Sequence, residues 1–129
     1  MDKNIKKYCV YSNSTIRESL ELIDINKEGF VLVINQQNIL KGIATDGDIR
    51  RYLLKDGNIH NKIIKCSKKN FKSVYKDITH EEIYKMLDDN IRMLPVVKKD
   101  NTLINVFTKR NIPERKQRLY YSRAKAPVR

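Results

Sequence analysis

The sequence predicts an α+β fold built from two copies of one helix-strand-strand-helix unit, related by pseudo-twofold symmetry. Three observations support this prediction. The 129-residue chain matches itself when it is shifted by 63 positions, so that Glu18 meets Glu81. Each copy opens with a helix-capping motif, and each then holds two short apolar runs of the kind found in buried strands. Because each unit alone has a small core, we expect the two to bury their apolar faces against each other.

The register of this internal repeat holds without a gap over most of both copies. The matched pairs include Leu20 and Ile83, Ile23 and Met86, Val31 and Leu94, Ile43 and Val106, Thr45 and Thr108, Asp48 and Asn111, and Ile49 and Ile112. The duplication predicts a first repeat at residues 1–60 and a second at residues 61–115. Residues 116–129 then form a basic linker or the end of a helix.

The first helix of each copy begins at a threonine. Thr15 and Glu18 form a capping box, in which the hydroxyl accepts from a free amide and the glutamate reaches back to the threonine amide. Thr79 to Glu82 repeat this motif in the second copy. Apolar residues at helical spacing then predict one buried stripe on each helix. These are Ile16, Leu20 and Ile23 in the first copy, and Ile83, Met86 and Leu87 in the second.

In the first copy, the apolar run 30–34 predicts a buried strand. A polar turn at 35–38 and a return strand at 39–44 follow. A second helix should run from about Thr45 to near Gly57. Its expected inner face is made of Ile49, Leu53 and Leu54.

The second copy repeats these strands at 93–97 and 102–107, with the turn 98–101 between them. Pro95 removes one ladder hydrogen bond, so its strand should lie at an edge or where that amide is not needed. Asn111 and Pro113 are expected to be the cap and the first turn of a last helix.

The charge balance favours anionic partners, because 27 basic residues stand against 15 acidic ones, a net charge of +12. Nucleotides, nucleic acid or an acidic protein face would fit. The segment from Pro113 onward is the most basic part, and solvated lysines explain most of the remaining charge. Within that segment, Tyr120 and Tyr121 suit either a stacking platform for nucleic acid or the apolar face of a terminal helix.

Several function classes find no support in the sequence. It holds no Gly-rich phosphate loop and no recognisable nucleophile arrangement, so we expect no enzyme activity from these residues alone. Cys9 and Cys66 are expected to be reduced thiols in a cytoplasmic chain, and neither histidine has zinc-site spacing. The longest apolar run, 30–34, is far shorter than the ~20 residues that span a bilayer. We also expect no secretory signal in the first residues, MDKNIKKYCV.

Two strings resemble a known family. GIATDGDIRR, residues 42–51, and NVFTKRN, residues 105–111, each join a strand to a following Thr-x-x-Asp or Thr-x-x-Asn motif. Together with the repeat, they resemble a cystathionine-β-synthase (CBS) domain pair, or Bateman module, over roughly residues 8–113. The TDGDIRR string is similar to CBS pairs attached to bacterial sugar-phosphate nucleotidyltransferases and, in a related form, to arabinose-5-phosphate isomerases.

The resemblance implies a regulatory module that binds an adenosine nucleotide (AMP, ADP, ATP or S-adenosylmethionine) as its ligand. It also implies a homodimer assembled through helices, and control of an attached or partner enzyme, here a sugar-phosphate nucleotidyltransferase. The catalytic domain of such relatives begins near the position of SRAKAPVR, residues 122–129, so the chain is expected to be the N-terminal piece of a longer enzyme.

The resemblance also implies where the nucleotide would lie. Asp48, one turn into a helix, can accept hydrogen bonds from both ribose hydroxyls. Asn111 occupies the matching position in the second copy, but its carboxamide has a single acceptor oxygen. Thr45 and Thr108 lie at helix starts that suit a phosphate. Charge-assisted bonds would come from Arg50, Arg51, Lys109 and Arg110. The base would contact Phe30, Leu32 and Ile43 in one copy, and Pro95 and Val106 in the other.

Other interpretations of these residues remain open. Thr45, Asp46 and Asp48 are also what a helix start needs, namely a cap and acidic first-turn residues. Asp46 disfavours a nearby phosphate unless it points away or caps the helix. The fold is also compatible with a dimerisation scaffold that has no ligand, or with nucleic-acid binding through the basic tail.

Overall fold

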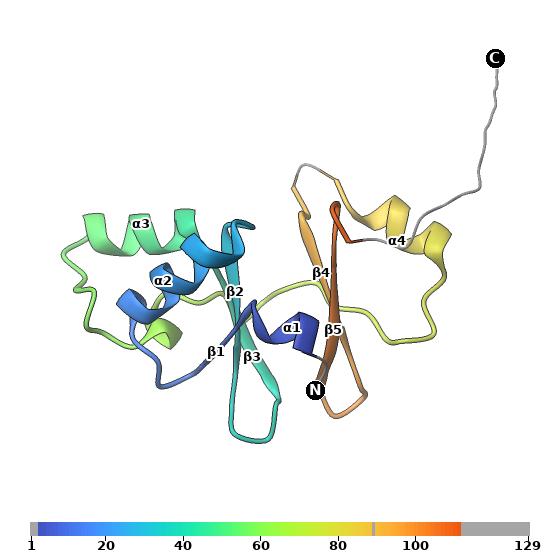
Figure 1. Cartoon of the computed structure of the whole chain (residues 1–129), viewed down its shortest axis with the longest axis horizontal. Helices are drawn as coiled ribbons and strands as arrows, with labels where there is room; N and C mark the ends of the chain where they lie inside the picture. The colour runs from blue at the N-terminus through green and yellow to red at the C-terminus, as the bar shows by residue number, and fades with distance from the viewer. Residues whose placement is uncertain (1–2, 89, 112–129) are drawn as a thin grey trace, which may run out of the picture. The chain divides into compact units, whose positions relative to one another are not determined.

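A computed structural model of the chain describes residues 3–88 and 90–111, and these residues form helices and short strands in a mixed α+β fold (Figure 1). In chain order the elements are α1 (Lys3–Lys6), β1 (Cys9–Tyr11), α2 (Ile16–Asn26), β2 (Phe30–Ile34), β3 (Leu40–Thr45), α3 (Asp46–Leu54), the 3₁₀ helix η1 (Ile63–Lys65), α4 (His80–Met86), β4 (Met93–Val97) and β5 (Leu103–Thr108). The expected last helix of the second copy, with Pro113, lies outside the described residues.

The chain divides into two compact units. Of the described residues, one unit comprises 3–76 and 95–105, and the other comprises 77–88, 90–94 and 106–111. The first unit holds a three-stranded sheet in the order β1-β2-β3, in which β1 runs parallel and β3 antiparallel to β2. Helices α2 and α3 pack on this sheet, against β2 and β3 (Figure 1). Strands β4 and β5 form a two-stranded sheet.

The central strand β2 is buried on both faces, which explains its unbroken apolar sequence. Val31 and Val33 face the core that the sheet shares with α2, α3 and η1. The alternate residues of a strand point to the opposite face, and there Phe30 stacks on Tyr8 with ring centroids 5.1 Å apart. The core on the helix side consists of Val10, Ile16, Val31, Val33, Ala44, Ile49 and Ile63.

The predicted capping boxes are present. Thr15 begins α2 with the Glu18 carboxylate accepting from the Thr15 amide at 2.8 Å, and Thr79 begins α4 through the same exchange with Glu82. In α4 the predicted stripe buries Ile83, and Leu87 is buried just after the last turn. A local side-chain exchange of this kind is encoded within four residues, so it is readable from sequence.

The prediction for Leu54 is wrong. We expected it on the inner face of α3, but its side chain is 78% exposed. Ile49 is buried and Leu53 packs against the core, four residues further on. Leu54 follows Leu53 by one residue, a rotation of about 100° around the helix axis, which carries it out of the buried stripe.

Pro95 lies in β4 where its missing amide is not needed. The Pro95 carbonyl accepts from the Val74 amide at 2.9 Å, and the Val97 amide donates to the Val74 carbonyl at 2.8 Å. Val74 and Val96 therefore form a parallel bridge that uses only the groups proline retains. The sequence-based expectation for Pro95 agrees with this arrangement.

A close approach at Gly42 holds the segment after η1 against β3. Ile43 and Lys68 exchange two backbone hydrogen bonds, of 3.0 Å and 2.8 Å. A Cβ on Gly42 would lie 2.9 Å from the Ser67 Cβ and 3.2 Å from the Lys68 carbonyl oxygen. Only glycine leaves room for this crossing segment, because the nearest atoms are a Cβ and a backbone oxygen, which cannot move aside as the end of a flexible side chain can.

Replacing Gly42 with alanine should lower the free energy of unfolding by about 1–3 kcal/mol, because the added methyl group pushes Ser67 and Lys68 away from β3. Gly47→Ala is the matched control. A Cβ there would meet only the ends of Arg50 and Arg51, which can move, so this variant should be neutral or slightly more stable. Urea denaturation measures both. Equal stability of Gly42→Ala and the parent chain would contradict the proposed close approach.

Candidate functional site

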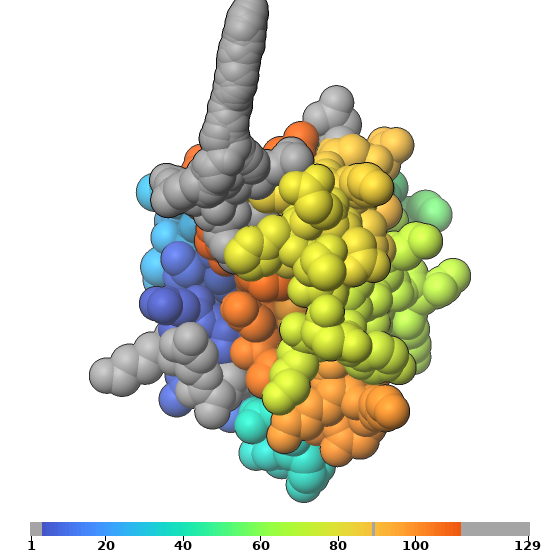
Figure 2. All heavy atoms as spheres, turned by 90° about the vertical axis from the view of Figure 1, so that its right-hand side faces the viewer, coloured from blue at the N-terminus to red at the C-terminus, as the bar shows by residue number. Residues whose placement is uncertain are grey.

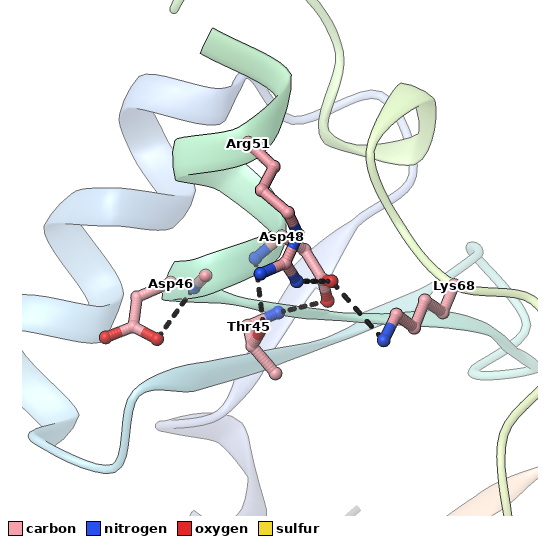
Figure 3. A network of polar contacts seen from close by, with 6 residues as sticks. Thr45, Asp46, Asp48, Arg51 and Lys68 are labelled. Carbon is pink, nitrogen blue, oxygen red and sulfur yellow. Dashed lines mark hydrogen bonds and ion pairs between the residues drawn. The ribbon is translucent and has the colours of Figure 1, made fainter. Parts of the chain in front are cut away.

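The junction between β3 and α3 is built as a capping box (Figure 3). Thr45 is the last residue of β3, and its extended backbone makes it the N-cap of α3. The Asp48 amide donates to the Thr45 hydroxyl at 3.0 Å, and the Thr45 amide donates to Asp48 Oδ2 at 3.0 Å. One oxygen of the Asp48 carboxylate is thereby fixed in position by the backbone.

The second oxygen of Asp48 lies against two cations. The Arg51 guanidinium donates to Oδ1 at 2.8 Å, and the Lys68 ammonium lies 3.6 Å from the same oxygen (Figure 3). The Asp48 side chain is only 6% exposed, whereas those of Arg51 and Lys68 are 60% and 67% exposed. The site therefore consists of a buried, fixed carboxylate covered by two solvated cationic side chains.

Burial of Asp48 raises the pKa of its carboxyl, but other interactions outweigh this effect. Backbone and side-chain hydrogen bonds of Thr45, the hydrogen bond from Arg51 and the charge of Lys68 together hold the pKa below its ordinary value. Asp48 is therefore an ionised hydrogen-bond acceptor at neutral pH.

Lys68 was missed by sequence reasoning. It lies in a lysine-rich stretch, and nothing local distinguishes it from its neighbours Lys65 and Lys69. Its place is set by the backbone pairing with Ile43, which the small size of Gly42 permits. A contact of this kind depends on a register between distant segments, so the only local signal is the glycine itself.

The remaining predicted residues of the first motif lie around the same helix start. A Cβ on Gly47 would be 3.3 Å from Arg51 Nη1 and 3.6 Å from Arg50 Nη2, so both guanidinium groups fold back over the first turn of α3. Asp46 points away from Asp48, and its Oδ1 accepts a hydrogen bond from the Gly47 amide at 2.8 Å (Figure 3). Thr45, Asp48, Arg50 and Arg51 are thus brought together.

The second motif also pairs its threonine with the residue three positions later, but its hydroxyl accepts a hydrogen bond from the Arg110 amide, at 3.3 Å. The Thr108 amide and hydroxyl both donate to Asn111 Oδ1, and the Asn111 Nδ2 donates to the Val106 carbonyl at 3.1 Å. Thr108 is buried, while Lys109 and Arg110 are exposed. Asn111 thus reaches back to Thr108, as Asp48 does to Thr45. Its single carboxamide oxygen is already engaged by Thr108.

The residues expected to contact a base are core residues in this structure. Phe30 and Leu32 are 1% and 0% exposed, and the Phe30 ring is covered by Tyr8. Ile43, Pro95 and Val106 are buried as well. Sequence reasoning assigned them a binding role from their apolar character, but it missed that Tyr8 occupies the face of Phe30.

Other candidate chemistry finds little support among residues 3–88 and 90–111. Both cysteines are free thiols, and burial raises the pKa of Cys9 to about 12. Burial and the charge of Asp48 raise the pKa of Cys66 to about 11, so neither thiol is activated as a nucleophile.

No cluster of metal-ligating side chains occurs in this part of the chain. None of its helices is both long and apolar enough to cross a bilayer. Tyr120, Tyr121 and the basic tail lie outside it.

The variants Asp48→Asn and Asp48→Ala separate two contributions of this carboxylate to stability, its charge and its hydrogen bond to the Thr45 amide. Asparagine keeps an acceptor for the Thr45 amide, as Asn111 does for Thr108, so it should lose only the interactions with Arg51 and Lys68. Alanine should additionally lose the cap, at about 1 kcal/mol.

The same pair tests the pKa direction. The pKa of the Asp48 carboxyl is lower in the folded chain than in the unfolded chain, where it is about 3.9. The ionised carboxylate therefore stabilises the fold above that pH, and this stabilisation is lost as pH falls through the lower, folded-state pKa. The stability advantage of the parent chain over Asp48→Asn should thus be constant from neutral pH to about pH 5 and shrink below about pH 4. Urea denaturation across pH measures it, and an advantage that grows on acidification would contradict the direction.

Comparisons with known proteins agree with this architecture. The family model for the CBS domain matches residues 1–55 and 63–115, once for each copy of the repeat. Among solved structures, the CBS domains of a transcriptional regulator from Streptococcus pneumoniae share 24% identity and superpose with a TM-score of 0.69, covering 83% of this chain and 87% of that one. The structure of CBSX2 in complex with AMP shares 22% identity at a TM-score of 0.68, covering 81% and 82%.

A curated relative shows the same module inside a longer protein. Homoserine O-acetyltransferase of Methanococcus vannielii is 31% identical over 114 residues, which make up 87% of this chain and 23% of that protein. The chain thus spans less than a quarter of this relative. CBS pairs are regulatory modules, and many form dimers. On the family match over both repeats, the chain belongs to the CBS-domain family, as a tandem pair.

Proposed function

We propose that this CBS pair binds an adenosine nucleotide at the start of α3 and transmits its presence to an attached or partner enzyme. The observation that carries the proposal is the Asp48 carboxylate, which is buried, ionised and fixed by Thr45 at one oxygen only. A carboxylate held in this way is suited to accept hydrogen bonds from the two neighbouring hydroxyls of a ribose.

The ribose would take the place of Arg51 at Asp48 Oδ1. Arg51 reaches this oxygen with a long side chain that is 60% exposed, so its displacement costs little buried surface. The displaced guanidinium and the Lys68 ammonium, which both form ion pairs with Asp48, would then lie beside the nucleotide. Both are suited to bind a phosphate near the helix start.

The charge of the site favours phosphorylated nucleotides over S-adenosylmethionine. Arg51 and Lys68 contact the single carboxylate of Asp48, while Asp46 points away (Figure 3). Arg50 adds a third positive charge over the same helix turn. A phosphate would be attracted by this excess of positive charge, whereas a sulfonium group would be repelled. We therefore propose AMP, ADP or ATP as the ligand class.

The second motif is proposed to bind a nucleotide weakly or not at all. Thr108 and Asn111 match Thr45 and Asp48 in position, but the Asn111 carboxamide uses its oxygen on Thr108 and its nitrogen on Val106. A ribose would have to break these hydrogen bonds without gaining a charged acceptor. Lys109 and Arg110 would then serve the second motif only as surface charge.

Relatives support the ligand class in general terms. CBSX2, which has the same fold, is described in complex with AMP. Two separate likenesses point to different partner enzymes. The TDGDIRR string resembles CBS pairs of sugar-phosphate nucleotidyltransferases, whereas the curated relative is an acetyltransferase that contains this module as 23% of its length. We propose a cytoplasmic nucleotidyltransferase as the controlled enzyme, on the strength of the string alone.

We also propose a homodimer formed through α2 and α3. Leu54 on α3 is 78% exposed and Ile25 on α2 is 72% exposed, the largest exposures among the big apolar side chains of the described residues. Leu54 borders a depression of 340 Å³ together with Leu20, Ile49 and Leu53. An exposed apolar surface of this kind favours association with a second copy. It equally supports a scaffold function without a ligand.

Calorimetric titration with AMP, ADP, ATP and S-adenosylmethionine tests the nucleotide proposal. The phosphorylated nucleotides should bind, and at a concentration of 100 times Kd they should raise the unfolding free energy by about 2.7 kcal/mol. Asp48→Asn should weaken binding by about tenfold or more, because one charged acceptor for the ribose is lost.

Asp46→Asn is the matched control, since it removes an equal charge from the same helix turn on the side away from Asp48. Its affinity should stay close to that of the parent chain. An unchanged affinity in Asp48→Asn would show that the ribose assignment is wrong. Absence of binding by every nucleotide would instead leave the scaffold function.

Leu54→Lys should shift the protein from dimer to monomer in sedimentation velocity, because a charge would be buried in the interface. The monomer should stay folded, because Leu54 is exposed within the single chain. Tyr75→Lys, a 54% exposed position away from α2 and α3, is the control and should remain a dimer. A parent chain that sediments as a monomer, or a Leu54→Lys dimer, would contradict the interface.

A further inference from the structure

A basic pocket lies in the first compact unit, apart from the Asp48 site. It has a volume of 610 Å³, and its lining residues come from the β1–α2 loop, the start of β3, the segment 62–71 and the β4–β5 turn. None of Thr45, Asp48, Arg51 and Lys68 contributes to it. A pocket of about 300–1,000 Å³ is the usual size for a small organic ligand.

Three lysines converge on this pocket from separate segments. Lys41 is the second residue of β3, Lys62 precedes η1, and Lys69 follows the segment that pairs with β3. No acidic residue lines the pocket, and no ion pair of these three lysines is found among residues 3–88 and 90–111. Like charges brought together repel one another, so an anion bound between them would relieve an unfavourable arrangement.

The lysines are held in place by their backbones. Lys62 forms a bridge with Thr15, and the neighbouring Ile63 amide donates to the Ser14 carbonyl at 2.8 Å. On the other side, the Leu40 amide donates to the Asn101 carbonyl at 3.0 Å, next to Lys41. These hydrogen bonds preform the walls, so binding would not have to order the chain.

The tips of the two hairpins form one end of the pocket. The Leu103 amide donates to the Asn38 carbonyl at 2.8 Å, and the Asn101 side chain donates to the Leu40 carbonyl at 3.1 Å. Figure 2 shows the two tips next to each other at the bottom of the view, teal for the first hairpin and orange for the second. The Asn101 side chain thus holds the two hairpin tips together at this end of the pocket, and the positive charge of the pocket comes from the three lysines.

The pocket is not purely ionic. Ile39, Ile64 and Phe71 line it with half-buried apolar side chains, and Leu40 below them is buried. A simple inorganic anion would leave this surface exposed to water, whereas an organic ligand would cover it. Ser12 and Asn13 add neutral hydrogen-bonding groups at the rim.

We propose that this pocket binds a small phosphorylated organic molecule, with its phosphate among Lys41, Lys62 and Lys69 and its apolar part on Phe71 and Ile64. Lysine suits a phosphate as a point charge. The ligand would lie between the hairpin tips and the segment that carries Lys68 to the Asp48 site, so its binding would reach the segment that positions Lys68.

The test uses the full chain and phenyl phosphate as the probe, followed by amide chemical shifts in NMR. Saturable shifts should concentrate at residues 39–41, 62–64 and 69–71. Inorganic phosphate and phenol should each bind more weakly, because each supplies only half of the recognised chemistry. Asp48→Asn should leave this affinity unchanged, which separates the pocket from the proposed nucleotide site.

The variant Lys41→Ala/Lys62→Ala/Lys69→Ala should weaken phenyl phosphate binding by about tenfold or more. The control Lys6→Ala/Lys55→Ala/Lys76→Ala removes the same charge from exposed positions elsewhere. It should change the affinity for phenyl phosphate by less than about twofold. All six side chains are exposed, and the amide spectra check folding directly. As a second readout, Phe71→Ala should weaken phenyl phosphate binding but not inorganic phosphate binding.

Three results would overturn the proposal. The first is equal weakening by both triple variants, which would show general charge attraction. The second is inorganic phosphate binding as tightly as phenyl phosphate, which would leave no role for the apolar surface. The third is a set of shifts concentrated at residues 45–51, which would place the probe at the Asp48 site.

Discussion

The hydrogen bond from the Thr45 amide to Asp48 Oδ2 is the constraint on which the site depends. It ends β3, begins α3 and fixes one oxygen of a buried carboxylate in a single step. Without it, Asp48 would be a surface residue on the first turn of a helix, free to rotate toward water. With it, the second oxygen is held at a defined place, where the largely exposed side chains of Arg51 and Lys68 contact it.

The same pairing of a threonine with the residue three positions later occurs elsewhere in the described residues, with different consequences. Thr15 with Glu18 and Thr79 with Glu82 make complete capping boxes, but these glutamates are exposed and serve the helix alone. Thr108 with Asn111 copies the geometry with a neutral side chain. Burial together with neighbouring cations, and not the cap itself, therefore distinguishes Asp48 as a candidate ligand-binding residue.

Sequence reasoning recovered what is encoded locally. The capping boxes, the buried strand 30–34 and the position of Pro95 each depend on a few neighbouring residues, and the structure agrees with all three. It failed for Leu54, where a one-residue difference in helical phase decides burial. It also missed Lys68 and the Tyr8 ring over Phe30, because these contacts depend on how distant segments align. Gly42, whose missing side chain admits the crossing segment, is the one local trace of that alignment.

A crystal structure of the chain with AMP tests the central claim most directly. Both ribose hydroxyls should lie within hydrogen-bond distance of the Asp48 carboxylate, the Thr45 amide should keep its bond to Oδ2, and Arg51 should have turned from Asp48 toward the phosphate. A complex in which AMP lies elsewhere while the Asp48–Arg51 ion pair stays intact would contradict it.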